Sequence, residues 1–311
     1  MKFDYIKCHG SGNEFVMVDA VRHNLEGVDL AGFSCFICNR NGAVGADGVL
    51  LLAKRGDMYG MRMFNPDGSE AEMCGNGIRC VARLAEEYVG ERKFDMFSGA
   101  NLYGITCEKD IFSGIPTYGV DLQVKLQSDD FGFADGAARF VSQPIEQLDD
   151  TLLWTAINVG NPHIVAEVDE IDYEYLTHLG NRVLELKDQF PKGINVSLVK
   201  VLADNRIFVA TYERGAGITA SCGTAMTSSA TAMALNSRCD YEATINVENR
   251  GGLVRCVCHN ECGLHTQLIG NASFISHGEV IAENGCFTYR ELGKFDEEIA
   301  LYSKFLEQKR G

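Results

Sequence analysis

The feature that most constrains the fold of this chain is an internal repeat with an offset of 148 residues. Cys74 and Cys222 each stand before a glycine and a helix-like stretch, and Asn13 and Asn161 each lie 61 residues before one of these cysteines. Two further pairs keep the same offset, Gly45 with Gly193 and Asn65 with Glu213. A repeat that stays in register over this length predicts two structurally similar halves.

Each half is expected to contain several short strands and one helix that follows the Cys-Gly pair. Alternating and β-branched residues predict strands at 15–19, 48–53, 60–64 and 118–125, and again at 164–168, 195–201, 207–212 and 242–247. Helices are predicted at 78–88 and 226–235, and an apolar stripe predicts a closing surface helix at 291–309. The polar, acidic segment 127–153 is expected to be an irregular connection between the halves.

Size and charge narrow the class of protein. A chain of 311 residues is expected to form two domains, and each half is long enough to bury a core. The net charge of −15 makes nucleic acid and anionic membrane surfaces poor partners, whereas a small amino acid can still bind through local dipoles. No signal-peptide pattern is visible, and no apolar run approaches the roughly 20 residues of a membrane span. We therefore expect a cytoplasmic enzyme with a small-molecule substrate.

The 12 cysteines are expected to be free thiols, because disulfides are rare in the cytosol. Cys35 with Cys38, and Cys256 with Cys258 and Cys262, could suggest a zinc or thiol-redox protein. No set of four ligands with tight-turn spacing accompanies them. The preferred interpretation is that these cysteines are small, buried apolar side chains and that no metal is bound.

Cys74 and Cys222 differ from the other cysteines because each begins a predicted helix. The positive end of the helix dipole is expected to lower the pKa of such a thiol from about 8.5 toward 7. The free N–H groups at Gly75 and Gly223 can bind a carboxylate. If both sites share one cleft, a thiolate can remove the Cα proton from one face of an amino acid while the other thiol protonates the opposite face. The sequence therefore predicts an amino-acid racemase or epimerase.

Other motifs exclude several classes of enzyme. The chain lacks a Gly-x-Gly-x-x-Gly fingerprint after a strand, a P-loop and a Gly-x-Ser-x-Gly elbow. Nothing indicates a lysine that would bind pyridoxal phosphate, so no cofactor is expected. His163 and Glu213 could tune or orient a thiol, and a hydrogen-bonded structural histidine is the alternative for His163.

Several segments resemble diaminopimelate epimerases, in the family order and over nearly the whole chain. They are HGSGNEF at 9–15, MFNPDGSEAEMCGNGIRC at 63–80, GNPH at 160–163, GINV at 193–196 and YERGAGITASCGT at 212–224. The resemblance implies an α/β (α+β) fold of two pseudo-symmetric lobes, each a curved, mostly antiparallel sheet or barrel around a central helix. We expect residues 1–126 and 277–311 to form the first lobe and residues 127–276 the second.

The resemblance also implies an activity and assigns roles by position. The activity is the interconversion of LL- and meso-diaminopimelate in lysine biosynthesis, without pyridoxal phosphate or metal. Cys74 and Cys222 resemble the two proton-transfer residues, and His163 and Glu213 resemble residues that adjust the thiol pKa values. Gly75, Asn76, Gly223 and Thr224 are similar to the cradle for the reacting carboxylate. The side chains expected to hold the rest of the substrate are Asn13, Asn65, Asn161, Asn195, Glu213 and Arg214.

Arg214 suits a distal carboxylate, because a guanidinium binds carboxylates in a bidentate fork. Turn formation is the alternative role of the asparagines, and of Asn65 above all. The chain departs from the family pattern at Gly48, Ile218, Ala225 and Asn271. These departures leave open a racemase of the same fold for another amino acid, such as histidine. A non-catalytic binding protein is a further alternative, against which the presence of both cysteines argues, and a homodimer also stays open.

Overall fold

The computed structural model describes residues 1–126, 131, 139–261 and 263–310. The chain divides into two compact units, of which the first comprises Met1–Val120 and Ile269–Gly311 and the second Asp121–Leu268. The chain leaves the first unit within strand β8 (Thr117–Gln123) and returns to it within strand β17 (His265–Asn271). The lobe boundaries expected from the sequence, at 126/127 and 276/277, fall after these two strands.

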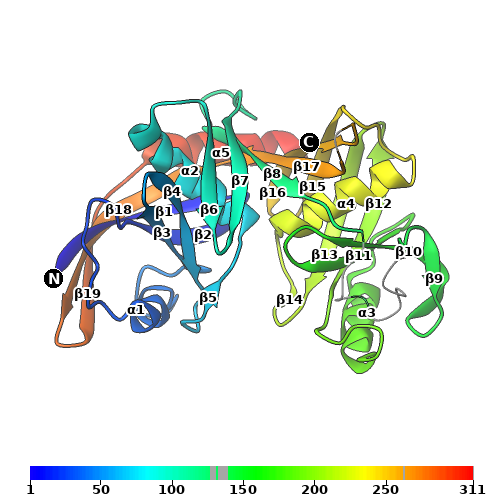
Figure 1. The fold of residues 1–311 in the computed structure, drawn as a ribbon, viewed down its shortest axis with the longest axis horizontal. Helices are drawn as coiled ribbons and strands as arrows, with labels where there is room; N and C mark the ends of the chain where they lie inside the picture. The colour runs from blue at the N-terminus through cyan, green and yellow to red at the C-terminus, as the bar shows by residue number, and fades with distance from the viewer. Residues whose placement is uncertain (127–130, 132–138, 262, 311) are drawn as a thin grey trace. The chain divides into compact units, whose positions relative to one another are not determined.

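The first unit is a sheet with three helices. Strands β1 and β2 pair in antiparallel fashion, β2 and β3 in parallel, β3 and β4 antiparallel, and β4 and β6 in parallel. Each parallel pair needs a crossover connection, and α1 and α2 lie in these connections (Figure 1). The elements are β1 (Lys2–Gly10), β2 (Asn13–Asp19), α1 (Leu30–Ile37), β3 (Val49–Arg55), β4 (Met58–Phe64), β5 (Glu70–Ala71), α2 (Gly75–Val89), β6 (Lys93–Ser98), β7 (Asn101–Cys107), β18 (Ser273–Glu283), β19 (Cys286–Lys294) and α5 (Asp296–Arg310).

The second unit repeats this order of elements and the same pairing directions. Strands β10 and β11 are antiparallel, β11 and β12 parallel, β12 and β13 antiparallel, and β13 and β15 parallel. Helices α3 and α4 lie in the two parallel connections. The elements are β9 (Gln143–Ile145), β10 (Asp149–Asn158), β11 (Pro162–Glu167), α3 (Tyr173–Glu185), β12 (Asn195–Ala203), β13 (Arg206–Glu213), β14 (Gly217–Ile218), α4 (Gly223–Leu235), β15 (Thr244–Asn249) and β16 (Gly252–His259). The predicted α+β fold with two similar halves is confirmed.

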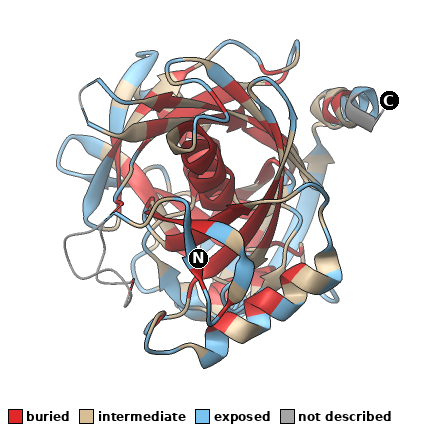
Figure 2. Ribbon diagram, turned by 90° about the vertical axis from the view of Figure 1, so that its right-hand side faces the viewer, coloured by how far each residue is buried: buried red, intermediate tan, exposed pale blue. Residues whose placement is uncertain are grey.

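One central helix in each unit begins at a Cys-Gly pair. Helix α2 buries most of its first ten residues and ends at Gly90, whose φ of 73° is the left-handed conformation that glycine adopts at helix ends. Helix α4 is buried from Gly223 to Ala234, and Figure 2 shows this buried helix ringed by strands. Two of its buried hydroxyl groups find acceptors within the helix, because Thr227 and Thr231 donate to carbonyl oxygens one turn back, at 2.9 and 2.8 Å. A helix buried on all sides has its N-terminus fixed by the surrounding strands.

Each unit has its own apolar core, which holds the central sheet rigid. In the first unit the core joins β1, β2 and β3 to α1 and includes Phe3, Val16, Phe33, Val49 and Leu51. In the second unit the core joins the four strands β10, β11, β12 and β13 to α3. It includes Trp154, Ile164, Leu179, Val196 and Leu198. These are the strands whose ends carry the predicted site residues.

Most predicted strands and both Cys-Gly helices are confirmed, with two corrections. The predicted helix at 291–309 begins only at Asp296, because Cys286–Lys294 pairs with β18 as the antiparallel strand β19. The predicted connection 127–153 is not irregular throughout, since β9 pairs with β10 inside it. Residues 127–130 and 132–138 of that segment lie outside the described residues. No helix within the described ranges combines the length and apolar character needed to cross a membrane.

Candidate active site

Cys74 is the N-cap residue of α2. Its backbone is extended, with φ −144° and ψ 112°, and its Sγ accepts a hydrogen bond from the N–H of Gly77 at 3.4 Å. An N-cap side chain that accepts from the first turn satisfies one of the N–H groups that the helix leaves unpaired. Gly77 also lets the helix approach β3, because a Cβ there would lie 2.8 Å from Leu50 Cδ2. The thiol is therefore held at the positive end of a buried helix.

Two predicted asparagines lie against this thiol. The Nδ2 of Asn76 donates to Oδ1 of Asn13 at 3.4 Å, and the Cys74 thiol lies 4.0 Å from the same oxygen. The Nδ2 of Asn13 donates to Oδ2 of Asp47 at 2.8 Å. The structure thus brings Asn13, Cys74, Gly75 and Asn76 together in the first unit, as the sequence predicts, and adds Asp47 to the group.

Arg79 is fully buried one turn into α2 and is not among the site residues that the sequence predicts. Its guanidinium donates to the Gly75 carbonyl at 3.0 Å, to Asn76 Oδ1 at 2.9 Å and to Ser11 Oγ at 3.2 Å. A Cβ on Gly10 or Gly270 would lie within about 3 Å of the guanidinium. These contacts fix the side chain of Asn76 and the turn that leads into Asn13.

Asn271, one of the departures from the family pattern, also belongs to this network. Its Oδ1 accepts from the Ser11 N–H at 2.7 Å, its Nδ2 donates to the His9 carbonyl at 3.2 Å, and its own carbonyl accepts from Arg79 Nε at 3.3 Å. Ser11 has a positive φ of 53°, which costs free energy in a residue other than glycine. The hydrogen bond that Asn271 accepts from Ser11 offsets part of that cost. No motif in the sequence predicts this hydrogen bond.

Asn65 makes turn contacts in the structure. Its N–H donates to the Ser69 carbonyl at 2.8 Å, its carbonyl accepts from Gly68 at 2.9 Å, and its Nδ2 donates to Ser69 Oγ at 3.0 Å. No described hydrogen bond of Asn65 reaches Cys74, Asn13 or Asn76. A role for Asn65 in binding substrate stays a prediction.

Cys222 is the N-cap residue of α4, in the second unit. Its backbone is extended, with φ −128° and ψ 112°, and its Sγ lies 3.4 Å from Thr224 Oγ1. Glu213 lies at the end of β13, where the hydroxyl of Thr219 donates to its Oε1. The structure thus groups Glu213, Cys222, Gly223 and Thr224, as the sequence predicts, and adds Thr219.

Burial and local charge set the pKa of each thiol. Burial raises the pKa of Cys74 to about 11, against an opposing effect of the Gly77 and Asn76 N–H groups and of Arg79. Burial also raises the pKa of Cys222 well above its ordinary value, and the nearby Glu213 carboxylate raises it further. The expected lowering of the pKa is wrong for the free protein, because removing a thiolate from water costs more free energy than the helix end returns. Both thiols are protonated near neutral pH.

His163 lies in a buried network of three side chains and a carbonyl group. Its Nε2 lies 2.9 Å from Asn161 Oδ1 and 3.5 Å from Asn195 Nδ2, and Asn195 Nδ2 also donates to the Pro162 carbonyl at 3.2 Å. Burial, together with the charge of Arg214, lowers the pKa of His163 to about 3. Asn161, His163 and Asn195 therefore form one uncharged cluster at neutral pH, and no described hydrogen bond joins His163 to Cys222.

Arg214 is exposed and held through main-chain groups. Its N–H donates to Asn195 Oδ1 at 2.8 Å, and its Nη1 donates to the Lys192 carbonyl at 2.5 Å. Its methylene groups cover Gly193, where a Cβ would lie 2.8 Å from Arg214 Cδ. Within the described ranges, no carboxylate lies in ion-pair distance of the guanidinium, so its charge is available to an anionic ligand.

The other cysteine groups lack the geometry of a metal site. Cys35 is exposed while Cys38, Cys256 and Cys258 are buried, and Cys262 lies outside the described residues. No group of three or more His, Cys, Asp or Glu side chains in the described part of the chain could hold a metal ion. The alternative of a structural zinc has no support in these residues.

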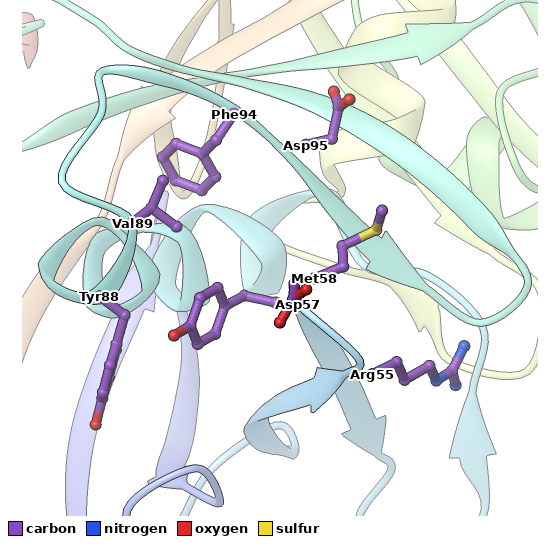
Figure 3. A pocket seen from close by; sticks show the side chains of 8 residues that line it. Arg55, Asp57, Met58, Tyr88, Val89, Phe94 and Asp95 are labelled. Atoms are coloured by element: carbon purple, nitrogen blue, oxygen red, sulfur yellow. The ribbon is translucent and has the colours of Figure 1, made fainter.

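A separate surface pocket of about 630 Å³ lies in the first unit, away from the predicted site residues (Figure 3). Its walls come from β3, β4, the end of α2 and the start of β6, with Tyr59 and Tyr88 stacked at 5.5 Å between ring centroids. None of the predicted catalytic or binding residues lines it.

Comparison with known proteins identifies the family. The family model described as Diaminopimelate epimerase matches residues 5–110 and 155–275, which include both Cys-Gly pairs. The chain belongs to the diaminopimelate epimerase family. The diaminopimelate epimerase of Clostridium acetobutylicum is 34% identical over 100% of this chain and 96% of its own length. That of Lactiplantibacillus plantarum is 37% identical over 88% of each chain.

Solved structures share the fold at low sequence identity. A Bacillus anthracis phenazine biosynthesis protein of the PhzF family has a TM-score of 0.64 at 16% identity, over 91% of this chain and 100% of that one. A hydroxyproline epimerase from Agrobacterium vitis has a TM-score of 0.59 at 12% identity, over 90% and 91% of the two chains. As a member of the diaminopimelate epimerase family, the chain is an isomerase.

Proposed function

We propose that this chain is a diaminopimelate epimerase, which inverts one α-carbon of diaminopimelate by proton transfer between two thiols. The observation that carries the proposal is the pair of cysteines that cap the central helices at equivalent positions of the repeat, in a chain of this family. The relatives that match most of the chain are named for the same activity.

Cys74 and Cys222 act on opposite faces of the reacting carbon. In one direction the Cys74 thiolate takes the Cα proton, and the C–H electron pair delocalises toward the substrate carboxylate. The Cys222 thiol then gives its proton to the other face, and its sulfur keeps the electron pair. The reverse direction exchanges the two roles. The N–H groups of the first helical turns, beginning at Gly75 and Gly223, stabilise the negative charge that develops on the carboxylate.

Substrate binding supplies the charge that makes a thiolate accessible. Both thiols have raised pKa values in the free protein. An opposite charge within about 4–6 Å favours the ionised form of a group, and the α-ammonium group of the substrate is such a charge. Arg79 lies near Cys74 and Glu213 near Cys222, so Cys74 is the thiol that ionises more readily.

The remaining site residues hold the substrate. Asn13 and Asn76 offer amide groups beside Cys74, and Asn161 and Asn195 offer them in the second unit. Arg214 binds the distal carboxylate, for which its uncompensated charge is suited. His163 is uncharged, so it acts by orienting Asn161 and Asn195 and not as an acid.

The test is incorporation of solvent deuterium at Cα, followed by NMR and chiral chromatography, with LL-diaminopimelate, meso-diaminopimelate and histidine as substrates. Wild type is expected to exchange and epimerise the diaminopimelates only. Cys74→Ala and Cys222→Ala are each expected to abolish epimerisation, because inversion needs a proton donor or acceptor on both faces. Cys35→Ser, a change at an exposed thiol outside the site, is the matched control and should keep full activity. Exchange with histidine alone, or full epimerisation by either alanine variant, would contradict the proposal.

A further inference from the structure

The position of Asp47 fixes the orientation of a side chain beside the Cys74 thiol. Asp47 stands just before β3, and its own N–H donates to the Glu14 carbonyl at 2.7 Å. Its Oδ2 accepts from Asn13 Nδ2 at 2.8 Å and from the Glu14 N–H at 2.9 Å. Its Oδ1 pairs with Arg40 at 2.7 Å. Three donors therefore hold this carboxylate in one position.

An amide group has a donor end and an acceptor end, so fixing one end fixes the other. Because Asn13 Nδ2 faces Asp47, its Oδ1 faces Cys74 at 4.0 Å and Asn76 at 3.4 Å. Asn76 is fixed in the same sense, because Arg79 donates to its Oδ1 at 2.9 Å and leaves Nδ2 to face Asn13. The two amides form a directed chain of hydrogen bonds that begins at a buried cation and ends at a carboxylate.

We infer that Asp47 is a positioning residue, which locks the carbonyl oxygen of Asn13 toward the Cys74 thiol and so keeps that thiol in its proton-bearing form until substrate binds. This inference rests on the proposed role of Cys74. An oxygen acceptor stabilises S–H and repels S⁻, whereas an N–H donor in its place would stabilise the thiolate. Asp47 thus prevents Asn13 from turning an N–H donor toward Cys74, which would stabilise the Cys74 thiolate before substrate binds.

The internal repeat gives independent support for a positioning role of Asp47. The residue 148 positions after Asp47 is Asn195, the first residue of β12, which is the strand of the second unit that corresponds to β3. Asn195 likewise contacts candidate site groups, through its bonds to the Arg214 N–H at 2.8 Å and the Pro162 carbonyl at 3.2 Å. The same position in both units therefore holds neighbouring site segments in place.

The experiment measures the alkylation rate of Cys74 by iodoacetamide between pH 7 and 10, from the mass spectrum of its own peptide and without substrate. Asp47→Ala removes both the charge and the acceptor, so Asn13 can turn its Nδ2 toward the sulfur. Asp47→Asn removes the charge but keeps an acceptor for Asn13. Glu14→Gln removes a neighbouring charge that does not contact Asn13, since Glu14 pairs with Lys7 and Arg40. Asp47→Val, which also has neither charge nor acceptor, takes the place of the alanine variant if circular dichroism shows that the latter is unfolded.

The expected result is that Asp47→Ala alkylates at Cys74 about 3- to 10-fold faster than Asp47→Asn at pH 8, the effect of one hydrogen bond on the thiolate fraction. Glu14→Gln should stay within about twofold of wild type. Equal rates for the alanine and asparagine variants, or an equal acceleration in Glu14→Gln, would overturn the inference. Because the assay uses no substrate, a failure here is distinct from a failure of the proposed epimerase activity, which the deuterium experiment reports.

Discussion

Replacing Arg214 with methionine tests the substrate through the group that would bind its far end. The Arg214 guanidinium is exposed, its stem covers Gly193, and its Nη1 donates to the Lys192 carbonyl. Methionine keeps much of the stem and removes the charge. The fold should therefore be retained while binding of a distal carboxylate is lost.

The magnitude follows from the donors that the structure leaves available. A guanidinium has five N–H donors, and among the described residues only its bond to Lys192 uses one of them. The Nε and Nη2 edge can then make a bidentate pair with a carboxylate, for which loss of a charge-assisted bond costs about 1.5–3 kcal/mol, or roughly 10- to 150-fold in kcat/KM. Arg214 is exposed, and solvent screening favours the lower part of this range.

The assay is kcat/KM for LL-diaminopimelate, with circular dichroism and thiol alkylation as checks of the fold and of the thiols. Arg206→Met is the matched control, since Arg206 is an exposed arginine at the other end of β13 that pairs with Glu248. It should keep wild-type kcat/KM. A folded Arg214→Met protein with unchanged kcat/KM would refute the assignment of Arg214 to the distal carboxylate.

Two further predictions concern pH. Glu213 raises the pKa of Cys222, so the Glu213→Gln protein should be alkylated faster at Cys222 at any pH below that pKa. The alkylation rate of Cys74 should not change and is the internal control. An unchanged rate at Cys222 would show that the Glu213 carboxylate does not act on that thiol. The pKa of His163 is lowered to about 3 in the folded protein, below the value of about 6.5 for an unperturbed histidine. Folding therefore binds fewer protons, and stability that is complete above about pH 6.5 is lost as the pH falls toward 3. The measurement is the free energy of unfolding in urea, which should fall less between pH 6.5 and 4 for His163→Gln than for wild type. The variant keeps part of the pH dependence, because the pKa of His9 is also lowered, to about 4. Parallel plots of this free energy against pH for the two proteins would contradict the prediction.

The fold could be predicted to a large extent because the repeat fixes the order of elements. Landmarks at Asn13, Asn65 and Cys74 mark strand ends and a helix start, and each has a counterpart 148 residues later. The closing segment was harder to predict, because Leu292 fits a helical stripe that continues to Phe305 as well as it fits a strand. Only pairing with β18 decides between them, and pairing between distant segments leaves no local signal in the sequence.

The residues of the candidate site also divide into those that the sequence predicts and those that it does not. Residues with a distinctive local pattern, Cys74 and Cys222 above all, could be singled out in advance. Arg79 and Asp47 could not, because their roles depend on which distant groups the fold brings to them. The direction of the thiol pKa shifts also depends on burial, which the Cys-Gly pattern does not report.

Unequal surroundings of the two cysteines have a consequence for turnover in the proposed mechanism. Each inversion moves the thiolate from one cysteine to the other, so the complex that releases product differs from the complex that bound substrate. As product leaves, that thiolate takes a proton from water, and the other thiol gives one up when the next substrate binds. Glu213 beside Cys222 makes the complex with an anionic Cys222 the higher in free energy, so these proton exchanges differ between the two directions of the reaction. The equilibrium constant belongs to the substrate alone, yet the two directions of the reaction should saturate at different maximal rates.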